Sequence, residues 1–323
     1  MMINSVLGPL SPEQMGKTLV HDHFNFAYPG YPADLSIAPY DYNVERGRCL
    51  EMCDTLNEIG IKTVMDPTPC DAHGRNPELY AEVSQKSGIN IILCTGLLNE
   101  HDGAPQYWIT MYGKDISKMI TDLFIKEISE GILQTGIKAG FIKVGCSSAL
   151  TDYEKSVHIA AVNAQKATGV PIITHTDERS GVEQAEFLLS LGADPKKIMI
   201  GHVNSVNDVN YHRAILQKGT SIAFDRMGLA AVFDFTEEDN CRNVAQLIKE
   251  GFVKKIMLSQ DTVLSLGRDR FADLNEEWSN AFKNSKIDFI CREAIPMLKA
   301  EGVTDQQINT MFIDNPKNLF LGV

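Results

Sequence analysis

Two histidines near the N-terminus, His21 and His23, are placed as ligands of a metal ion would be. They lie two residues apart in the run TLVHDHF, which has the composition of a β-strand. Because side chains alternate between the two faces of a strand, both imidazoles point to one face and Asp22 points to the other. Two imidazoles so placed can bind one divalent ion, although ordinary buried histidines can show the same spacing.

Three further candidates share a position at the end of an apolar run. His175 ends IITHTD, His202 ends MIGHVN and Asp261 ends MLSQD. A single histidine in such a place is most often a buried polar residue with ordinary hydrogen-bond partners. Four histidines and an aspartate that recur at the same depth predict a metal site instead, because imidazole nitrogens and carboxylate oxygens suit zinc and similar divalent ions.

A sixth candidate, Lys143, lies within the apolar run GFIKVGC. Five ligands are too many for one catalytic ion with an open position and too few for two ions, so a bridging group is needed. A buried ammonium is costly unless it is paired, so one interpretation gives Lys143 a carboxylate partner. In the other, burial and metal charge lower its pKa, and the neutral amine adds carbon dioxide to form a bridging carbamate. The residues alone leave both interpretations open.

The elements that must position these residues follow a repeating plan. Short apolar runs rich in β-branched residues alternate with amphipathic helical patterns, for example at 116–132 and 153–168. The eight predicted strands are 18–24, 61–68, 89–97, 140–146, 170–177, 197–203, 220–227 and 255–261.

Eight strands that alternate with helices indicate an α/β chain with a parallel sheet, and eight strands close such a sheet into a (β/α)8 TIM barrel. The alternative, an open doubly wound sheet, expects a glycine-rich phosphate turn after the first strand, and the sequence has none there. We therefore predict a single barrel domain over 1–323. Its binuclear metal centre would lie at the C-terminal ends of the strands, where barrel enzymes build their active sites.

The composition and charge of the chain exclude several classes of partner. Its 323 residues are 44% hydrophobic and 22% charged, with a formal net charge of −12. Such a surface repels phosphate backbones and anionic membranes, so we expect a small-molecule substrate and neither nucleic acid nor membrane as partner. No apolar run has the length of a membrane span, the N-terminus lacks a signal-peptide pattern, and the seven cysteines are scattered. We expect a cytoplasmic protein with reduced thiols, and a homodimer as its assembly.

Nearly the whole chain resembles the phosphotriesterase family of the amidohydrolase superfamily, and especially its phosphotriesterase-like lactonases. Nine stretches carry the resemblance, in the family's order and roughly its spacing: TLVHDHF, DPTPCDAHGR, ILCTGL, AGFIKVGCS, IITHTDE, IGHVNSVND, FDRMG, IMLSQD and DNPKNLF. The resemblance implies two divalent ions, most often zinc, with cobalt, manganese or iron as alternatives. It implies a carboxylated lysine that bridges them and a full ligand set of His21, His23, Lys143, His175, His202 and Asp261.

The mechanism that the resemblance implies is hydrolysis by a hydroxide that bridges the two ions. One ion polarises the carbonyl or phosphoryl oxygen, while Asp261 orients the hydroxide and carries its proton away. Arg226, in FDRMG, matches an arginine that lines the family's substrate pocket. Its alternative role is an ion pair with Asp225 or with a surface carboxylate.

The pocket departs from the usual lactonase pattern. Leu98 takes the place of a tyrosine after the third strand, Met227 stands where an aromatic residue is frequent, and Gln260 precedes the final aspartate where histidine or asparagine is common. A known lactone substrate therefore does not carry over to this chain.

Loops supply the remaining candidates, because binding specificity usually resides in loops. The stretch 99–108 brings His101 and Trp108 near the exit of the third strand, Tyr28 follows the first strand, and the segment 261–278 predicts a lid over the mouth. The predicted catalytic residues are Asp261 and Arg226, and the predicted substrate-binding residues are Tyr28, Leu98, His101, Trp108, Arg226 and Met227.

These observations predict a binuclear metal-dependent hydrolase of a lactone or related carboxylic ester. Phosphotriester hydrolysis, with the same hydroxide attacking phosphorus, and amide hydrolysis are the enzymatic alternatives. A non-catalytic ligand-binding barrel is the alternative from a different class, although all six metal positions hold competent residue types. The polar residues Asn99, His101, Arg226 and Arg268 around the mouth favour a ligand with hydroxyls or an anionic group over a hydrophobic triester.

Overall fold

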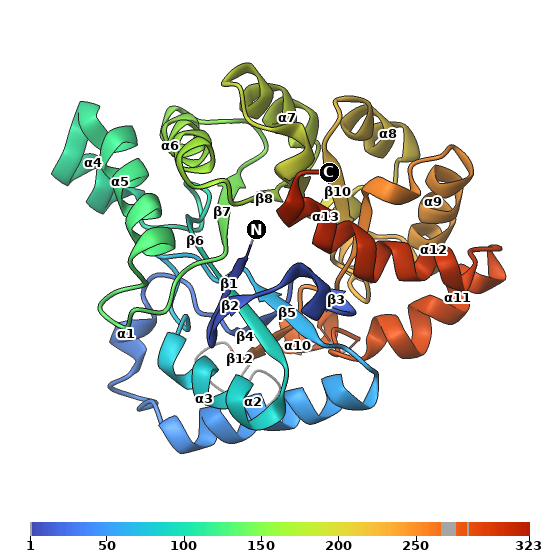
Figure 1. The fold of residues 1–323 in the computed structure, drawn as a ribbon, viewed down its shortest axis with the longest axis horizontal. Coiled ribbons are helices and arrows are strands. Elements are labelled where there is room, and N and C mark those ends of the chain that lie inside the picture. Colours follow the sequence, from blue (N-terminus) through green and yellow to red (C-terminus); the bar gives the residue numbers. More distant parts are fainter. Residues whose placement is uncertain (1, 266–275, 283) are drawn as a thin grey trace.

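The structure is a computed structural model that describes residues 2–265, 276–282 and 284–323 (Figure 1). The predicted lid over 261–278 falls mostly outside these residues, and so does Arg268.

Eight parallel strands alternate with helices and form the barrel that the sequence predicts (Figure 1). Each strand pairs with the next one along the chain, so the order never reverses as it would in a doubly wound sheet. The strands are β3 (Thr18–Leu19), β5 (Thr63–Asp66), β6 (Asn90–Leu97), β7 (Phe141–Cys146), β8 (Ile172–Thr176), β9 (Ile198–Ile200), β10 (Ser221–Phe224) and β11 (Ile256–Leu258).

The barrel closes between its first and eighth strands, each of which continues past a short break. β4 (His23–Asn25) follows β3, β12 (Val263–Ser265) follows β11, and these two extensions pair in parallel. The predicted first strand is interrupted because the backbone N–H of His21 donates to the hydroxyl of Ser259 and not to a neighbouring strand. The N–H of Asp261 in turn donates to the His21 carbonyl over 3.1 Å. Closure of the barrel therefore places His21, the first predicted ligand in the chain, beside Asp261, the last one.

Helices surround the barrel (Figure 1), and most of them contribute buried apolar side chains to the core between helices and strands. The second predicted helix begins at a capping box, in which Thr151 and Glu154 accept each other's backbone N–H. None of the described helices has the length and apolar character to cross a membrane. The helices are α1 (Tyr31–Asp34), α2 (Tyr42–Glu58), α3 (Pro77–Ser87), α4 (Pro105–Tyr112), α5 (Ile116–Ser129), α6 (Asp152–Thr168), α7 (Gly181–Ser190), α8 (Val209–Gln217), α9 (Glu237–Lys249), α10 (Glu276–Ala281), α11 (Ile295–Ala300), α12 (Asp305–Asn309) and α13 (Asn315–Leu321).

The strands separate two apolar cores. Along β6, Ile91 and Leu93 join the larger core between strands and helices, whereas Ile92 and Cys94 join the smaller core inside the barrel. A hairpin that the sequence analysis missed, β1 (Ile3–Ser5) with β2 (Gly8–Leu10), adds apolar side chains to the inner core. It closes the N-terminal end of the barrel and leaves the opposite end for the site. All seven cysteines are free; the cytoplasmic location and the homodimer stay predictions.

Candidate metal centre

The six predicted metal ligands come together at the C-terminal end of the barrel. The imidazole rings of His21 and His175 both lie 4.6 Å from the ring of His202, centroid to centroid. The Nζ atom of Lys143 lies 3.3 Å from Nε2 of His21. These side chains come from five different strands or strand exits, so only the closed barrel places them in one cluster.

The spacing of three ligand atoms fits a metal ion. Oδ1 of Asp261 lies 3.4 Å from Nε2 of His21 and 3.5 Å from Nε2 of His23. Two ligand atoms each about 2.1 Å from a tetrahedral ion are about 3.4 Å apart. These two distances therefore match the ligand spacing of zinc or a similar ion, and all three atoms lie within 4.8 Å of one another.

The second half of the cluster contains Lys143, His175 and His202. Nε2 of His175 lies 2.9 Å from Oδ1 of Asp177, so Nδ1 is the ring nitrogen that remains available to a metal ion. Nζ of Lys143 donates to the carbonyl of Thr174. Among the residues that the structure describes, no carboxylate lies within ion-pair distance of Lys143, so the interpretation that gave it a carboxylate partner finds no support there.

Burial sets the protonation states that ligation requires. It lowers the pKa of the His21 imidazole to about 4, so this ring is neutral at physiological pH. It also lowers the pKa of Lys143 to about 8, which brings the neutral amine within reach of ordinary conditions. Burial alone would raise the pKa of Asp261, but the neighbouring His202, His21 and Arg226 hold it well below its usual value. Asp261 is therefore an anion.

Asp225 has a role that the sequence analysis missed. Its Oδ2 lies 2.9 Å from Nδ1 of His21, and its Oδ1 lies 3.1 Å from Nδ1 of His202. By distance alone, Asp225 could also bind a metal ion together with His21 and His202. Because it faces the Nδ1 atoms, whereas Nε2 of both rings faces Asp261, we interpret it as the partner that orients them. The sequence did contain one indication of this role, because Asp225 follows the apolar run SIAF at the same depth as the ligands.

Arg226 forms its ion pair with Asp261. The alternative role considered from the sequence, an ion pair with Asp225, is therefore not the one observed. Nε of Arg226 donates to Oδ2 of Asp261 over 3.1 Å, and its Nη1 donates to the hydroxyl of Ser205 over 2.9 Å. The guanidinium also lies over the ring of Phe233, 5.6 Å from its centroid. Arg226 therefore holds the carboxylate that is predicted to carry the proton.

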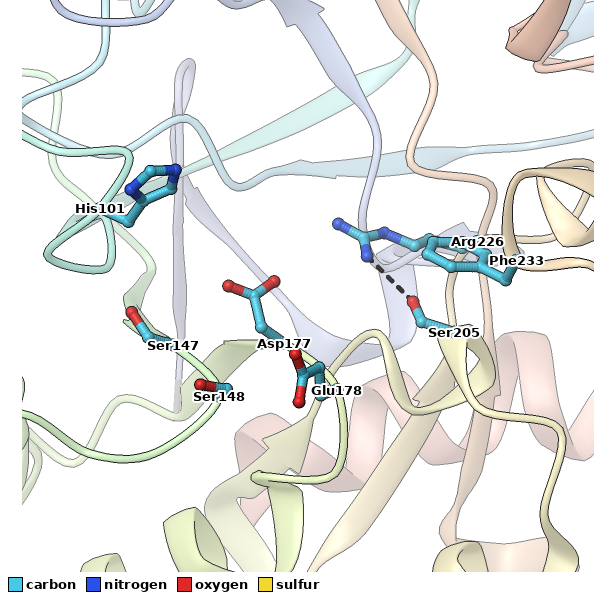
Figure 2. Close-up of a pocket in the computed structure, with 8 residues that line it drawn as sticks. All are labelled: His101, Ser147, Ser148, Asp177, Glu178, Ser205, Arg226 and Phe233. Carbon is cyan, nitrogen blue, oxygen red and sulfur yellow. Dashed lines mark hydrogen bonds between the residues drawn. The ribbon is translucent and has the colours of Figure 1, made fainter.

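A cavity of about 470 Å³ opens at the ligands. Figure 2 shows Ser147 and Ser148 on one side, Arg226 with Ser205 on the other, and two carboxylates between them. Two of its residues touch the ligands directly, since Asp177 contacts His175 and Arg226 contacts Asp261. The lining residues are His101, Ser147, Ser148, Asp177, Glu178, Ser205, Arg226 and Phe233.

Comparison with known proteins decides the family. The sequence model of the phosphotriesterase family matches residues 1–320. The chain belongs to this family. The aryldialkylphosphatase of Saccharolobus solfataricus is 32% identical over 329 residues, which cover 96% of each chain. The solved organophosphorus hydrolase from Deinococcus radiodurans is 40% identical, with a TM-score of 0.94 over 99% of this chain and 97% of that one. An N-acetyltaurine hydrolase of Danio rerio is 25% identical and covers 98% of this chain and 96% of its own.

The phosphotriesterase family is metal-dependent, and the histidines and Asp261 of this chain form groups that can bind a metal ion. His21, His23 and Asp261 form such a group by the distances given above. The identity of the metal and the carboxylation of Lys143 stay proposals.

The substrate-binding residues predicted for this family member lie in different surroundings. His101 lines the cavity, and Tyr28 lies exposed at the mouth, its ring 5.0 Å from that of Phe26. Leu98 packs with Phe26 in a small apolar cluster, and Phe26 lies 5.2 Å from the ring of His23. This cluster gives the mouth an apolar side. The contacts of these residues with substrate stay predictions.

Two of the predicted substrate-binding residues lie apart from the cavity surface. Met227 is fully buried within the larger core, so its side chain packs against the barrel wall and not toward solvent. Trp108 lies on α4, half-buried, with its ring 5.6 Å from that of Tyr112. The full burial of Met227 speaks against a direct substrate contact, because the residue after a strand-end arginine can turn into the core as easily as into the pocket. Contact of Trp108 with substrate stays a prediction.

Proposed function

We propose that this phosphotriesterase-family protein is a binuclear metal-dependent hydrolase of a lactone or related carboxylic ester. The observation that carries the proposal is the cavity at the ligands, in which seven of the eight lining residues are polar or charged. A triester carries bulky arms on three sides of phosphorus and fits an apolar, wide pocket. A lactone has a planar carbonyl, and polar substituents on its ring can bind to such a lining.

The proposed ions would be held by the six buried or half-buried ligands, with zinc favoured by their nitrogens and carboxylate, and cobalt, manganese or iron as alternatives. When bound, two divalent ions supply Lewis-acid activation of the substrate and activation of water near neutral pH. The protein contributes the geometry: Asp225 orients His21 and His202, and Thr68 lies 2.7 Å from Nδ1 of His23.

The proposed bridging group forms on Lys143. Its neutral amine attacks the carbon of carbon dioxide, a nitrogen–carbon bond forms, and one proton leaves the nitrogen. The product is a carbamate anion with two oxygens where a single ammonium stood. The lowered pKa of Lys143 and the absence of a carboxylate partner among the described residues both support this step.

Asp261 and Arg226 carry the proposed proton transfer. Asp261 is anionic and lies between the histidines, so it can hold a water molecule by a hydrogen bond and accept its proton as the carbonyl is attacked. Arg226 keeps Oδ2 of this carboxylate in place, while Oδ1 faces His21 and His23. The arginine also borders the cavity, where it can contact a bound substrate.

The names of three relatives point to two other substrate classes. The names aryldialkylphosphatase and organophosphorus hydrolase support phosphotriester hydrolysis, and the name N-acetyltaurine hydrolase supports hydrolysis of an amide. A barrel that only binds its ligand is the alternative without catalysis, and the candidate metal-binding group of His21, His23 and Asp261 and the ionised Asp261 argue against it.

A substrate panel on one metal-loaded preparation tests the proposal. We expect kcat/KM for a polar lactone or ester to exceed that for a paraoxon-like triester by at least about tenfold, a difference that pocket contacts commonly produce. A higher value for the triester, or no turnover of any lactone or ester, would overturn it. Turnover of amides alone would favour the amide alternative, and no turnover of any class would favour the binding barrel.

A further inference from the structure

One wall of the cavity consists of hydroxyls and carboxylates. Ser147 and Ser148 follow β7, and Asp177 and Glu178 follow β8. Figure 2 shows the two carboxylates between these serines and Arg226 on the opposite side. Carboxylates only accept hydrogen bonds, whereas serine hydroxyls both donate and accept them. The wall is therefore rich in acceptors.

The two carboxylates differ in their partners. Asp177 is held by His175 over 2.9 Å and by the side-chain amide of Asn99 over 3.0 Å. Glu178 is exposed and, within the described residues, has no ion-pair partner. Its charge is therefore available to a ligand, while that of Asp177 is partly satisfied by the protein.

The backbone holds Glu178 in a conformation that non-glycine residues seldom adopt. Its φ is 48°, and the ligands His202 and Asp261 have φ values of 57° and 52°. Among the described residues these are three of the five non-glycine residues with positive φ, so this conformation is concentrated at the site. The turn places Glu178 on the cavity wall directly after the strand that carries His175.

The opposite wall offers little to an anion. Among the described residues that line the cavity, Arg226 is the one cation, and it already pairs with Asp261 and with Ser205. The polar residues around the mouth predicted a ligand with hydroxyls or an anionic group. The arrangement of charges supports the first of these and opposes the second, because a free carboxylate would meet Asp177 and Glu178 at the wall.

We propose that Glu178, with Asp177 beside it, makes this site select substrates whose ring carries a hydrogen-bond donor. Among such donors, an ammonium group is preferred to a hydroxyl. A substrate with a free carboxylate in the same place is disfavoured. This inference rests on the proposed function, since it names the class of lactone or ester that the site takes. Glu178 is a specificity-determining residue here and takes no part in the chemical step.

Matched substrates test the preference. We would assay γ-butyrolactones that carry hydrogen, hydroxyl, amino or carboxylate at the α carbon, at about pH 6.5, where an α-amino group is largely protonated. We expect kcat/KM to fall in the order amino, hydroxyl, hydrogen, carboxylate. Raising the salt concentration should reduce the differences in kcat/KM among the four substrates, because exposed charges are screened.

Variants at position 178 assign the preference to its carboxylate. Glu178→Gln should lower the amino-to-hydrogen ratio of kcat/KM by about fivefold, the upper range for an exposed ion pair. Glu178→Lys should reverse the order of the amino and carboxylate substrates. Glu51→Gln, which removes an exposed charge from α2 on the outer ring, should leave every ratio unchanged.

Unreactive analogues separate this inference from the proposed function. Calorimetric binding of the matched γ-lactams to metal-loaded protein should show the same order and the same effect of Glu178→Gln without any turnover. Lactone turnover with ratios that Glu178→Gln leaves unchanged would overturn the inference and spare the proposed function. No lactone turnover, with the charge preference intact in lactam binding, would overturn the proposed function and support the inference about the wall.

Discussion

The metal-ligand cluster and the acceptor-rich wall of the cavity are neighbours in the chain but are built differently. His175 lies on β8 and Glu178 lies in the loop three residues later. The ligands are mostly buried and are held by strands and by partners such as Asp225, whereas Glu178 is exposed and has no ion-pair partner among the described residues. From this difference we propose that residues held by the strands cleave the bond and that loop residues select the substrate. Substitutions in the two regions should therefore have different effects.

The largest effect is expected at Lys143. Lys143→Ala should remove most bound metal and lower kcat by roughly three orders of magnitude, because metal activation contributes several kcal/mol to such reactions. Acetate or propionate should restore part of both by taking the place of the carbamate. Metal content by mass spectrometry and kcat with and without the acids are the measurements. A Lys143→Ala variant with full metal and full rate would exclude the carbamate.

Asp261 should show a smaller effect of a different kind. Asp261→Asn keeps an oxygen ligand but loses the base, so kcat should fall roughly 10²-fold or more while metal content falls less than in Lys143→Ala. Asp152→Asn, at a fully exposed position on α6, is the matched control and should change neither quantity. Equal turnover in Asp261→Asn and the parent would mean that the proton leaves by another route.

Substitution of Asp225 tests whether a residue outside the ligand set contributes to metal binding. Asp225→Asn should weaken metal affinity by about 10- to 100-fold, because His21 and His202 lose the carboxylate that orients them. Titration against a chelator measures the affinity, and saturating metal should restore most of the activity. An unchanged affinity would show that the strands alone hold the two rings.

Arg226 borders both regions and should show the smallest effect. If it acts mainly on the cavity side, Arg226→Ala should raise KM by up to about tenfold and change kcat less. Arg226→Lys is the control that keeps the charge but loses the paired donors to Asp261 and Ser205. A loss confined to kcat would place Arg226 with the metal-ligand cluster, as the residue that positions Asp261.

The sequence predicted the strands, and the depth at which the candidate histidines and Asp261 lie, because both follow from spacing along the chain; the role of Lys143 came from the family resemblance. A barrel repeats one unit, so a histidine or aspartate at the end of an apolar run is placed at the same depth each time, as His202 and Asp261 are. The assigned order of strands and the family are both confirmed. The interrupted first strand was not predicted, because the cause lies in Ser259, more than two hundred residues away.

Partners across the barrel were also beyond the sequence analysis. Asp225 looked like a neighbour of Arg226, but its carboxylate turns inward to His21 and His202 while the arginine reaches Asp261. Glu178 gave no signal at all, since one exposed glutamate after a strand resembles many others. Such roles depend on which direction a loop residue points, and adjacency along the chain does not fix that direction.

Metal content at saturation tests the central claim most directly. The protein would be loaded with zinc, freed of excess metal and measured for zinc per chain. The account predicts about two ions per chain, since six ligands with an anionic bridge exceed the needs of one ion. A plateau at one ion or none in correctly folded protein would contradict the binuclear centre, and with it the mechanism built on Lys143.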